Sequence, residues 1–174
     1  KEGLYYASKR LPKASCFELD AVSMSIFSEY DVVGCFDVLE HIKPDDCVLS
    51  NIYHALKPEG SLLLTVPQHM FLWSTTDTVA GHKRRYSSSD LLLKLRTAGF
   101  KIQLATSFVC LLFPLLVCIR YFARDAKYDA ESEFNLHPVV NKSLFLIMLV
   151  ELLLIRCGIR FPYGGSLLVI AQKK

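Results

Sequence analysis

An apolar stretch that ends abruptly in charged residues is the feature that most constrains this chain. Residues 30–36 read Tyr-Asp-Val-Val-Gly-Cys-Phe, and Asp37, Glu40 and His41 follow at once. A nearly continuous apolar run of this length is typical of a parallel strand whose two faces are covered by helices. Open α/β sheets bind ligands at the carboxyl ends of such strands. The stretch therefore predicts an α/β fold with a ligand site at Asp37, Glu40 and His41.

The segments after this stretch alternate between helical and strand patterns. Apolar residues recur at helical spacing from Asp45 to Leu56, and a second helix is predicted between Ser87 as its N-cap and Gly99 as its C-cap. The predicted strands are residues 61–66, 100–107 and 165–173. This alternation predicts one doubly wound α/β domain.

Two shorter elements are predicted before residue 30. Residues 3–10 resemble the tail of a helix, and residues 15–19 predict a short strand that ends at Asp20. The first residue is Lys1, and no signal-peptide pattern follows it. We therefore expect the chain to begin within a longer protein.

The charge and cysteine content limit the classes of function. The 174 residues carry a net charge of +3, and their Lys and Arg residues are neither gathered in a tract nor interleaved with aromatic residues, so nucleic acid is not an expected partner. The six cysteines form no Cys-x-x-Cys pair, and several lie in apolar runs where a free thiol packs as a small apolar group. We expect a reducing, cytoplasmic environment. No pattern indicates an oligomeric state.

An apolar insertion, residues 108–157, precedes the last predicted strand. Residues 108–119 carry no charge and residues 144–155 carry only Glu151, while the link at residues 124–133 is strongly charged. Each run has about 12 residues, short of the roughly 20 that cross a bilayer, so neither predicts a spanning helix.

Cations flank both apolar runs, as they do in helices at an anionic lipid surface. They are Arg120, Arg124, Lys142, Arg156 and Arg160. The insertion predicts either helices that cover the sheet or the substrate site, or a peripheral membrane contact through residues 108–122 and 143–157.

Four motifs, in this order and spacing, resemble those of the class I S-adenosylmethionine-dependent methyltransferases, in the small-molecule branch. They are Phe17-Glu18-Leu19-Asp20-Ala21, Phe36-Asp37-Val38-Leu39-Glu40-His41-Ile42, the run from Ala55 to Pro67, and His82-Lys83-Arg84-Arg85-Tyr86 ahead of Ala98-Gly99-Phe100. The resemblance covers about residues 3–107 and the last strand. It implies a Rossmann-like methyltransferase fold with the sheet order 3-2-1-4-5-7-6, and S-adenosylmethionine as the cofactor.

The resemblance also implies roles for the matching residues. Asp20 would accept a hydrogen bond from the adenine amino group, and Ala21 would offer its backbone to the ring. Phe36 and Asp37 would line the pocket near the methionine part of the cofactor. Considered without the family, Asp20 and Asp37 are better interpreted as loop caps.

Part of the cofactor site of this family has no counterpart in the chain. The glycine-rich loop and the acidic residue that hold the methionyl group and the ribose would both precede Lys1. Without strands one and two, the strand at residues 30–36 has an unpaired edge. We therefore expect residues 1–174 to form one partial methyltransferase domain, either a fragment or a truncated form that repacks. Alone it would bind S-adenosylmethionine weakly or not at all.

His41 is the candidate catalytic base, because an imidazole titrates near neutral pH and lies just beyond the strand that carries Asp37. The alternative is a structural imidazole bonded to the backbone. A second interpretation takes Asp37, Glu40 and His41 as metal ligands, since some oxygen methyltransferases carry a similar Glu-x-x-Glu-His arrangement. His69 and His82 would then be further ligands.

The long loop at residues 68–86 is predicted to form a wall of the acceptor pocket. Its candidate substrate-binding residues are Trp73, His82, Arg84, Arg85 and Tyr86. The two arginines suit a phosphate or carboxylate, or form a solvated basic turn. Two functions remain: the C-terminal part of a methyltransferase for a small or lipid-linked acceptor, or a non-catalytic membrane-associated or scaffold module with a degenerate methyltransferase fold.

Overall fold

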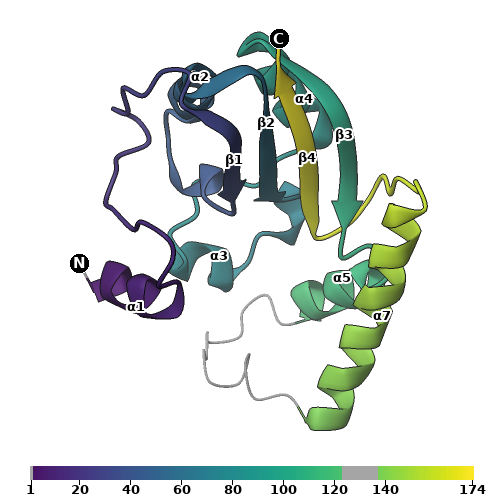
Figure 1. Cartoon of the computed structure of the whole chain (residues 1–174). Coiled ribbons are helices and arrows are strands. Elements are labelled where there is room, and N and C mark those ends of the chain that lie inside the picture. Colours follow the sequence, from purple (N-terminus) through teal and green to yellow (C-terminus); the bar gives the residue numbers. More distant parts are fainter. Residues whose placement is uncertain (1, 123–136) are drawn as a thin grey trace.

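A four-stranded sheet forms the centre of the molecule (Figure 1). The computed structural model describes residues 2–122 and 137–174. The strand order is β1-β2-β4-β3, with β1 parallel to β2 and β4 antiparallel to both its neighbours. The strands are β1 (Tyr30–Phe36), β2 (Leu56–Pro67), β3 (Phe100–Phe108) and β4 (Ser166–Lys173). This order matches the 4-5-7-6 half of the sheet that the family resemblance implies.

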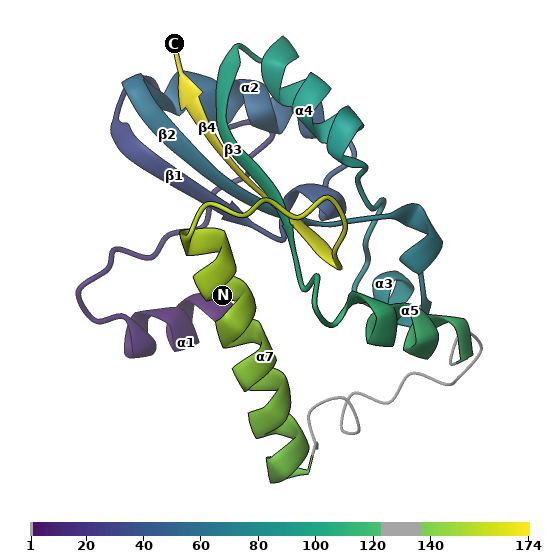
Figure 2. The same cartoon turned by 90° about the vertical axis from the view of Figure 1, so that its right-hand side faces the viewer.

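Two helices, α2 (Asp45–Ala55) and α4 (Ser88–Thr97), cover one face of the sheet (Figure 2). Their apolar side chains pack against alternate residues of the strands, because successive side chains of a strand point to opposite faces. The core that results includes Val48, Leu49, Ile52, Leu62, Leu64, Val66, Leu91, Leu95, Leu167 and Val169.

Local signals set the limits of α4. The Ser87 hydroxyl accepts a hydrogen bond from the Asp90 amide at 3.1 Å, which caps the first turn. Gly99 follows the helix with a φ of +100°, and a Cβ placed there would lie 2.9 Å from the Tyr53 ring. The predicted N-cap is confirmed, whereas the C-cap is Ala98 and Gly99 is the left-handed residue directly after it.

The predicted strand at residues 15–19 is wrong. These residues have no regular secondary structure. A strand needs a partner for its backbone hydrogen bonds, and no strand in the described part of the chain pairs with them. Within that same part, β1 pairs on one side only, with β2. The other predicted strands and the helices at residues 3–10, 45–56 and 87–98 are confirmed.

The expectation that both faces of β1 are covered is also wrong. Cys35 is the one buried residue of this strand, while Val32 is 57% exposed and Phe36 is 56% exposed. The reason is visible in Figure 2, where α2 and α4 lie on the same side of the sheet and no helix of the described residues covers β1 on the other. The apolar run therefore leaves apolar side chains in solvent.

The short elements of residues 68–86 and the apolar helices lie at the carboxyl ends of β1, β2 and β3, at the lower edge in Figure 1. The polar loop contains η2 (Met70–Leu72) and α3 (Thr75–Val79), and η1 (Leu39–His41) follows β1. The apolar helices are α5 (Phe113–Phe122) and α7 (Pro138–Arg156), and α1 (Glu2–Arg10) stands apart.

Helix α7 is longer than the apolar run from which it was predicted. It has 19 residues, and it is long and apolar enough to cross a membrane, by length and composition. Only 6% of its apolar stretch is buried. The expectation of a short helix is wrong because residues 138–143 join the apolar run in one helix that starts at Pro138, a residue suited to a first helical turn. The charged link at residues 124–133, with Arg124, lies outside the described residues.

Candidate active site

The polar residues after β1 converge on Glu40. This side chain is fully buried, and neither of its carboxylate oxygens has a hydrogen-bond partner among the described residues. The Nε2 atom of His41 lies 4.0 Å from Glu40 Oε1, and Nε2 of His82 lies 3.9 Å from the same atom. The two imidazole rings are in edge contact, with their centroids 4.7 Å apart. Residues 42 positions apart in the sequence thus meet at one carboxylate.

Asp77 sets the orientation of His82. Asp77 Oδ1 lies 2.9 Å from His82 Nδ1, and since a carboxylate only accepts, Nδ1 carries the proton. The other ring nitrogen, Nε2, faces Glu40 at 3.9 Å. Arg85 donates to both oxygens of Asp77, at 2.9 and 3.1 Å. Burial raises the pKa of Asp77, but the hydrogen bonds and charge of Arg85 outweigh it, so the pKa lies below its usual value.

The surroundings of Glu40 disfavour the charged form of its carboxyl group. Burial raises its pKa, and the negative charge of Asp37 acts in the same direction. A buried carboxylate that faces an imidazole lone pair is costly unless a proton or a cation lies between them. Glu40, His41 and His82 form a group whose ligand atoms all lie within 4.8 Å of one another, as in a metal site.

The group differs from the metal set expected from the sequence. Asp37, which has a positive φ of +51°, is not part of it, and His82 takes its place. His69 also lies outside the group: its ring stacks on Phe71 and Tyr163, with centroids 5.1 and 5.9 Å away. His41 is part of the group, and its side chain is 40% exposed. Its role as a catalytic base stays a prediction.

The predicted acceptor residues of the loop are mostly engaged with partners inside the chain. Arg84 lies 2.7 Å from Asp45 Oδ2, and the buried Tyr86 hydroxyl donates to the same oxygen at 2.8 Å. Trp73 donates its indole N–H to Thr78 at 3.3 Å. With Arg85 paired to Asp77, these contacts stabilise the loop and leave little capacity for an anionic ligand. Acceptor binding by these residues stays a prediction.

Of the predicted cofactor residues, Asp20, Phe36 and Asp37 are exposed, and Ala21 is half-buried. Asp20 accepts hydrogen bonds from the Val22 amide at 2.9 Å and the Ser23 hydroxyl at 3.0 Å, which fits the loop-cap interpretation. Asn51 of α2 holds this loop by donating to the carbonyl of Ala21 at 2.9 Å. At the end of β1, Phe36 is exposed. The roles of Asp20, Ala21, Phe36 and Asp37 in cofactor binding stay predictions.

Sequence reasoning missed Glu151, which is 1% exposed on the otherwise exposed helix α7. Its Oε2 atom accepts hydrogen bonds from the amides of Cys110 and Leu111, at 2.7 and 2.8 Å. Its Oε1 atom is buried and has no partner among the described residues. The available signal was a single charge inside a run of twelve apolar residues.

A cavity of about 260 Å³ lies between α7 and the sheet. It is lined by Thr65, Phe108, Met148, Glu151, Leu152, Ile155 and Leu168. Thr65 belongs to the carboxyl end of β2, and its carbonyl accepts a hydrogen bond from the Asp37 amide at 3.0 Å. The cavity therefore adjoins the edge of the sheet on which the charged group lies.

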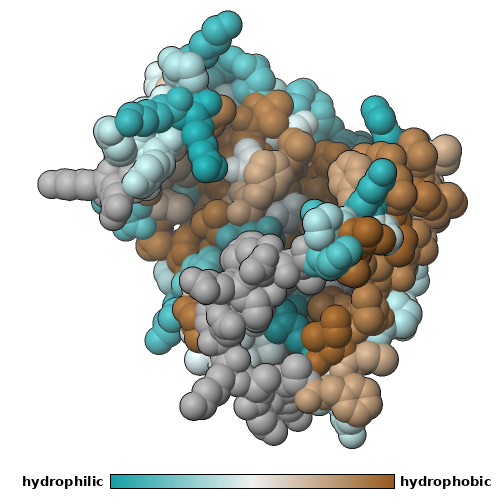
Figure 3. All heavy atoms as spheres, turned by 90° about the horizontal axis from the view of Figure 1, so that it is seen from below, coloured by the Kyte–Doolittle hydropathy of each residue, from teal (hydrophilic) through white to brown (hydrophobic). Residues whose placement is uncertain are grey.

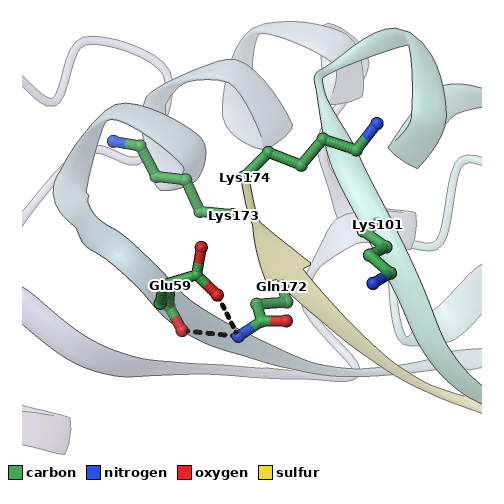
Figure 4. Close-up of a pocket in the computed structure, with 5 residues that line it drawn as sticks. All are labelled: Glu59, Lys101, Gln172, Lys173 and Lys174. Carbon is green, nitrogen blue, oxygen red and sulfur yellow. Dashed lines mark hydrogen bonds between the residues drawn. The ribbon is translucent and has the colours of Figure 1, made fainter.

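A larger pocket, of about 460 Å³, lies at the opposite end of the sheet (Figure 4). It is lined by Glu59, Lys101, Gln172, Lys173 and Lys174, and Gln172 donates to the Glu59 carboxylate at 2.9 Å and to its carbonyl at 3.1 Å. Its polar groups serve contacts between neighbouring strands, and parallel strands bind ligands at their carboxyl ends. We therefore place the candidate site at the other end of the sheet.

The strand order and the position of this site define a Rossmann-like fold of the class I methyltransferases. Residues 5–105 match the family described as a methyltransferase domain, and the chain belongs to that family. The comparison with curated protein sequences returned no match.

Several solved structures are similar to the chain. The [4+2]-cyclase SpnF has 18% identity and a TM-score of 0.54, over 97% of this chain and 60% of that one. Phosphoethanolamine N-methyltransferase 2 of Haemonchus contortus, in complex with S-adenosyl-L-methionine, has 20% identity and a TM-score of 0.50, over 88% and 36%. An S-adenosylmethionine-dependent methyltransferase from Mesorhizobium loti has 14% identity and a TM-score of 0.55, over 97% and 75%.

At these identities the similarity shows the fold alone. The chain spans 60% and 36% of the lengths of the first two proteins. Their descriptions also name different reactions, a cyclisation and an N-methylation, so the shared fold does not decide the reaction.

Proposed function

We propose that the chain is the C-terminal part of an S-adenosylmethionine-dependent methyltransferase that acts on a small or lipid-linked acceptor. The observation that carries this proposal is the family match over residues 5–105. The strand order β1-β2-β4-β3, which corresponds to the 4-5-7-6 half of the fold, supports it. The neighbours described as S-adenosylmethionine-dependent methyltransferases support it.

The proposed reaction needs few groups from the protein. A lone pair of the acceptor attacks the methyl carbon of the sulfonium, a carbon–acceptor bond forms, and the carbon–sulfur bond breaks. Close alignment of the two reactants supplies most of the acceleration, and a base is needed only where the acceptor must lose a proton. In this proposal His41 is that base, Asp20 and Ala21 hold the adenine, and Phe36 and Asp37 lie beside the methionine part.

Calorimetry with S-adenosylmethionine tests this proposal. The 174-residue chain is expected to bind weakly or not at all, while the protein translated from any extended reading frame is expected to bind in the micromolar range. Micromolar binding by the 174 residues alone would overturn the proposed division of the cofactor site. Absence of binding in the longest product would favour the second candidate, a non-catalytic module.

The second candidate and the membrane contact share one observation, the apolar surface of α5 and α7. Figure 3 shows apolar residues gathered at the right, over these helices. The large apolar side chains exposed there include Leu115, Ile119, Phe122, Val139, Phe145, Leu149, Val150 and Leu153. We propose that residues 108–122 and 143–157 rest on an anionic membrane at its cytoplasmic side. The exposed cations Lys142, Arg156 and Arg160 support contact with anionic lipid, and the six free thiols support a reducing compartment.

As an alternative to His41 as a catalytic base, we propose that Glu40, His41 and His82 bind a divalent metal ion. Zinc bonds to imidazole nitrogen and carboxylate oxygen are about 2.0–2.2 Å long, so ligand atoms 3.9–4.0 Å apart need only a small contraction around the ion. The contact between Asp77 and His82 Nδ1 supports the proposal, because histidine ligands usually donate their second ring N–H to a carboxylate. An ion there would also neutralise the carboxylate of Glu40.

A further inference from the structure

We infer that the cavity between α7 and the sheet binds an apolar molecule that carries an ammonium group, with Glu151 as the partner of that group. This inference deepens the proposed function, because it names the chemical class of the acceptor.

The first argument is the incomplete pairing of Glu151. The Cys110 and Leu111 amides donate to Oε2, at 2.7 and 2.8 Å, and fix the orientation of the carboxyl group. Oε1 is buried without a partner in the described part of the chain. A buried carboxyl oxygen that lacks a hydrogen bond is costly, and a ligand that donates to it relieves this cost.

The second argument is the composition of the cavity wall. The other lining residues are Thr65, Phe108, Met148, Leu152, Ile155 and Leu168, and none of them carries a positive charge. Among the described residues, a ligand at this place therefore has one carboxyl partner and an otherwise almost entirely apolar surrounding. Binding sites of this kind fix the orientation of an apolar ligand by a few polar groups. Because the partner is a carboxylate, a cationic donor complements it better than a hydroxyl group does.

The third argument is the position of the cavity. Leu152 lines it and is 49% exposed, and the neighbouring Leu153 and Leu149 continue the apolar surface along α7. A volume of about 260 Å³ is slightly below the usual range for ligand sites, so it accommodates the charged group and a short apolar segment. The rest of a longer molecule would follow α7. At the inner end, Thr65 connects the cavity to the Asp37 backbone.

The ammonium group anchors the ligand. It has no lone pair, so it cannot itself attack a methyl group while it is bound in this form. Glu151 is accordingly assigned as a binding residue and not as a catalytic one.

The test compares the binding of three probes of equal chain length, octylamine, octanol and octanoate, to the purified protein by calorimetry without S-adenosylmethionine. Octylamine is expected to bind about tenfold or more tightly than octanol, since a hydrogen bond between charged groups is stronger than a neutral one. Octanoate is expected to bind least. Equal binding of octylamine and octanol, which contact with the apolar face of α7 alone would produce, overturns the inference.

Two variants locate the binding. Glu151→Gln retains an acceptor for the two backbone amides but removes the charge, so octylamine should bind about tenfold more weakly while octanol changes by less than about twofold. Leu152→Trp fills the cavity and should weaken both. The control is Glu29→Gln, an exposed carboxylate far from the cavity in sequence. Unchanged octylamine binding in Glu151→Gln, or unchanged binding of both probes in Leu152→Trp, contradicts the inference.

The results distinguish a failure of this inference from a failure of the proposed methyltransferase function. If Glu151→Gln does not fold, as judged by circular dichroism, the wild-type comparison and Leu152→Trp still decide. Probe binding with no S-adenosylmethionine binding in any product of the reading frame would retain the cavity and reject the methyltransferase. The reverse result would retain the methyltransferase and reject the amine.

Discussion

The two faces of the sheet differ in how far their apolar side chains are buried and their polar groups are paired. On the face covered by α2 and α4, apolar side chains such as Leu64 and Leu95 are fully buried, and Asp45 is paired with Lys94, Tyr86 and Arg84. On the other face, Val32 and Phe36 are exposed, and at the strand ends the carboxylate oxygens of Glu40 have no hydrogen-bond partner among the described residues. The first face explains the stability of the fold. The uncovered face and the carboxyl edge of the sheet carry the cavity and the charged group for which an apolar ligand and a metal ion are proposed.

The largest expected effect is on stability and separates the two faces directly. Leu95→Ala should lower the free energy of unfolding by about 2–5 kcal/mol, because it leaves a cavity in a close-packed core. Phe36→Ala, on the exposed side, should change it by less than about 0.5 kcal/mol. Urea unfolding followed by circular dichroism measures both. Similar losses in the two variants would show that β1 is covered in solution.

The next effect concerns the metal group. Zinc at about one hundred times its dissociation constant should stabilise the protein by about 2.7 kcal/mol, seen as a higher melting temperature that a chelator reverses. Glu40→Gln should abolish the shift, while His54→Ala, a histidine on α2 outside the group, should retain it. A shift of the same size in Glu40→Gln would place the ion elsewhere.

The third prediction concerns Asp45, on the face covered by α2 and α4, and the dependence of stability on pH. Burial raises the pKa of Asp45, but hydrogen bonds from Lys94 and Tyr86 and the charge of Arg84 outweigh it and hold the pKa below its ordinary value of 3.8. Since the folded-state pKa is the lower one, the carboxylate stabilises the fold above pH 3.8, and this contribution is lost as the pH falls through the folded-state value.

Asp45→Asn should therefore cost about 1–3 kcal/mol at pH 7, and the difference from wild type should shrink in acid. Urea unfolding at a series of pH values measures it, with Asp46→Asn, an exposed neighbour, as the matched control. A difference that grows as the pH falls would contradict the assignment.

The smallest effect per residue is expected at the membrane contact. Sedimentation with phosphatidylserine vesicles should weaken with salt, and each of Lys142→Gln and Arg156→Gln should cost about 1 kcal/mol of binding. Leu153→Asp should weaken it at every salt concentration, because it places a charge in the apolar surface. Lys101→Gln, at the far end of the sheet, is the control. Binding that resists both salt and Leu153→Asp would favour a spanning helix.

Elements with strong local signals were predictable from the sequence. The limits of α4 follow from Ser87 and Gly99, and β1 follows from an apolar run bounded by polar residues. The strand at residues 15–19 failed, because pairing depends on a neighbour that local sequence does not reveal. The predicted length of α7 was too short, because the polar and charged residues before the apolar run do not end the helix. Such a residue ends a helix only where it also caps the free backbone groups.

The site shows the same division between local and long-range information. The sequence alone determined that carboxylates and an imidazole follow an apolar strand, because residues 36–42 are contiguous. Only the tertiary structure decided that His82 joins Glu40, that Arg84 and Arg85 are paired with Asp45 and Asp77, and that Glu151 is buried. The physical reason is that hydrogen bonds and burial depend on distances between residues far apart in the chain, which the folded backbone sets.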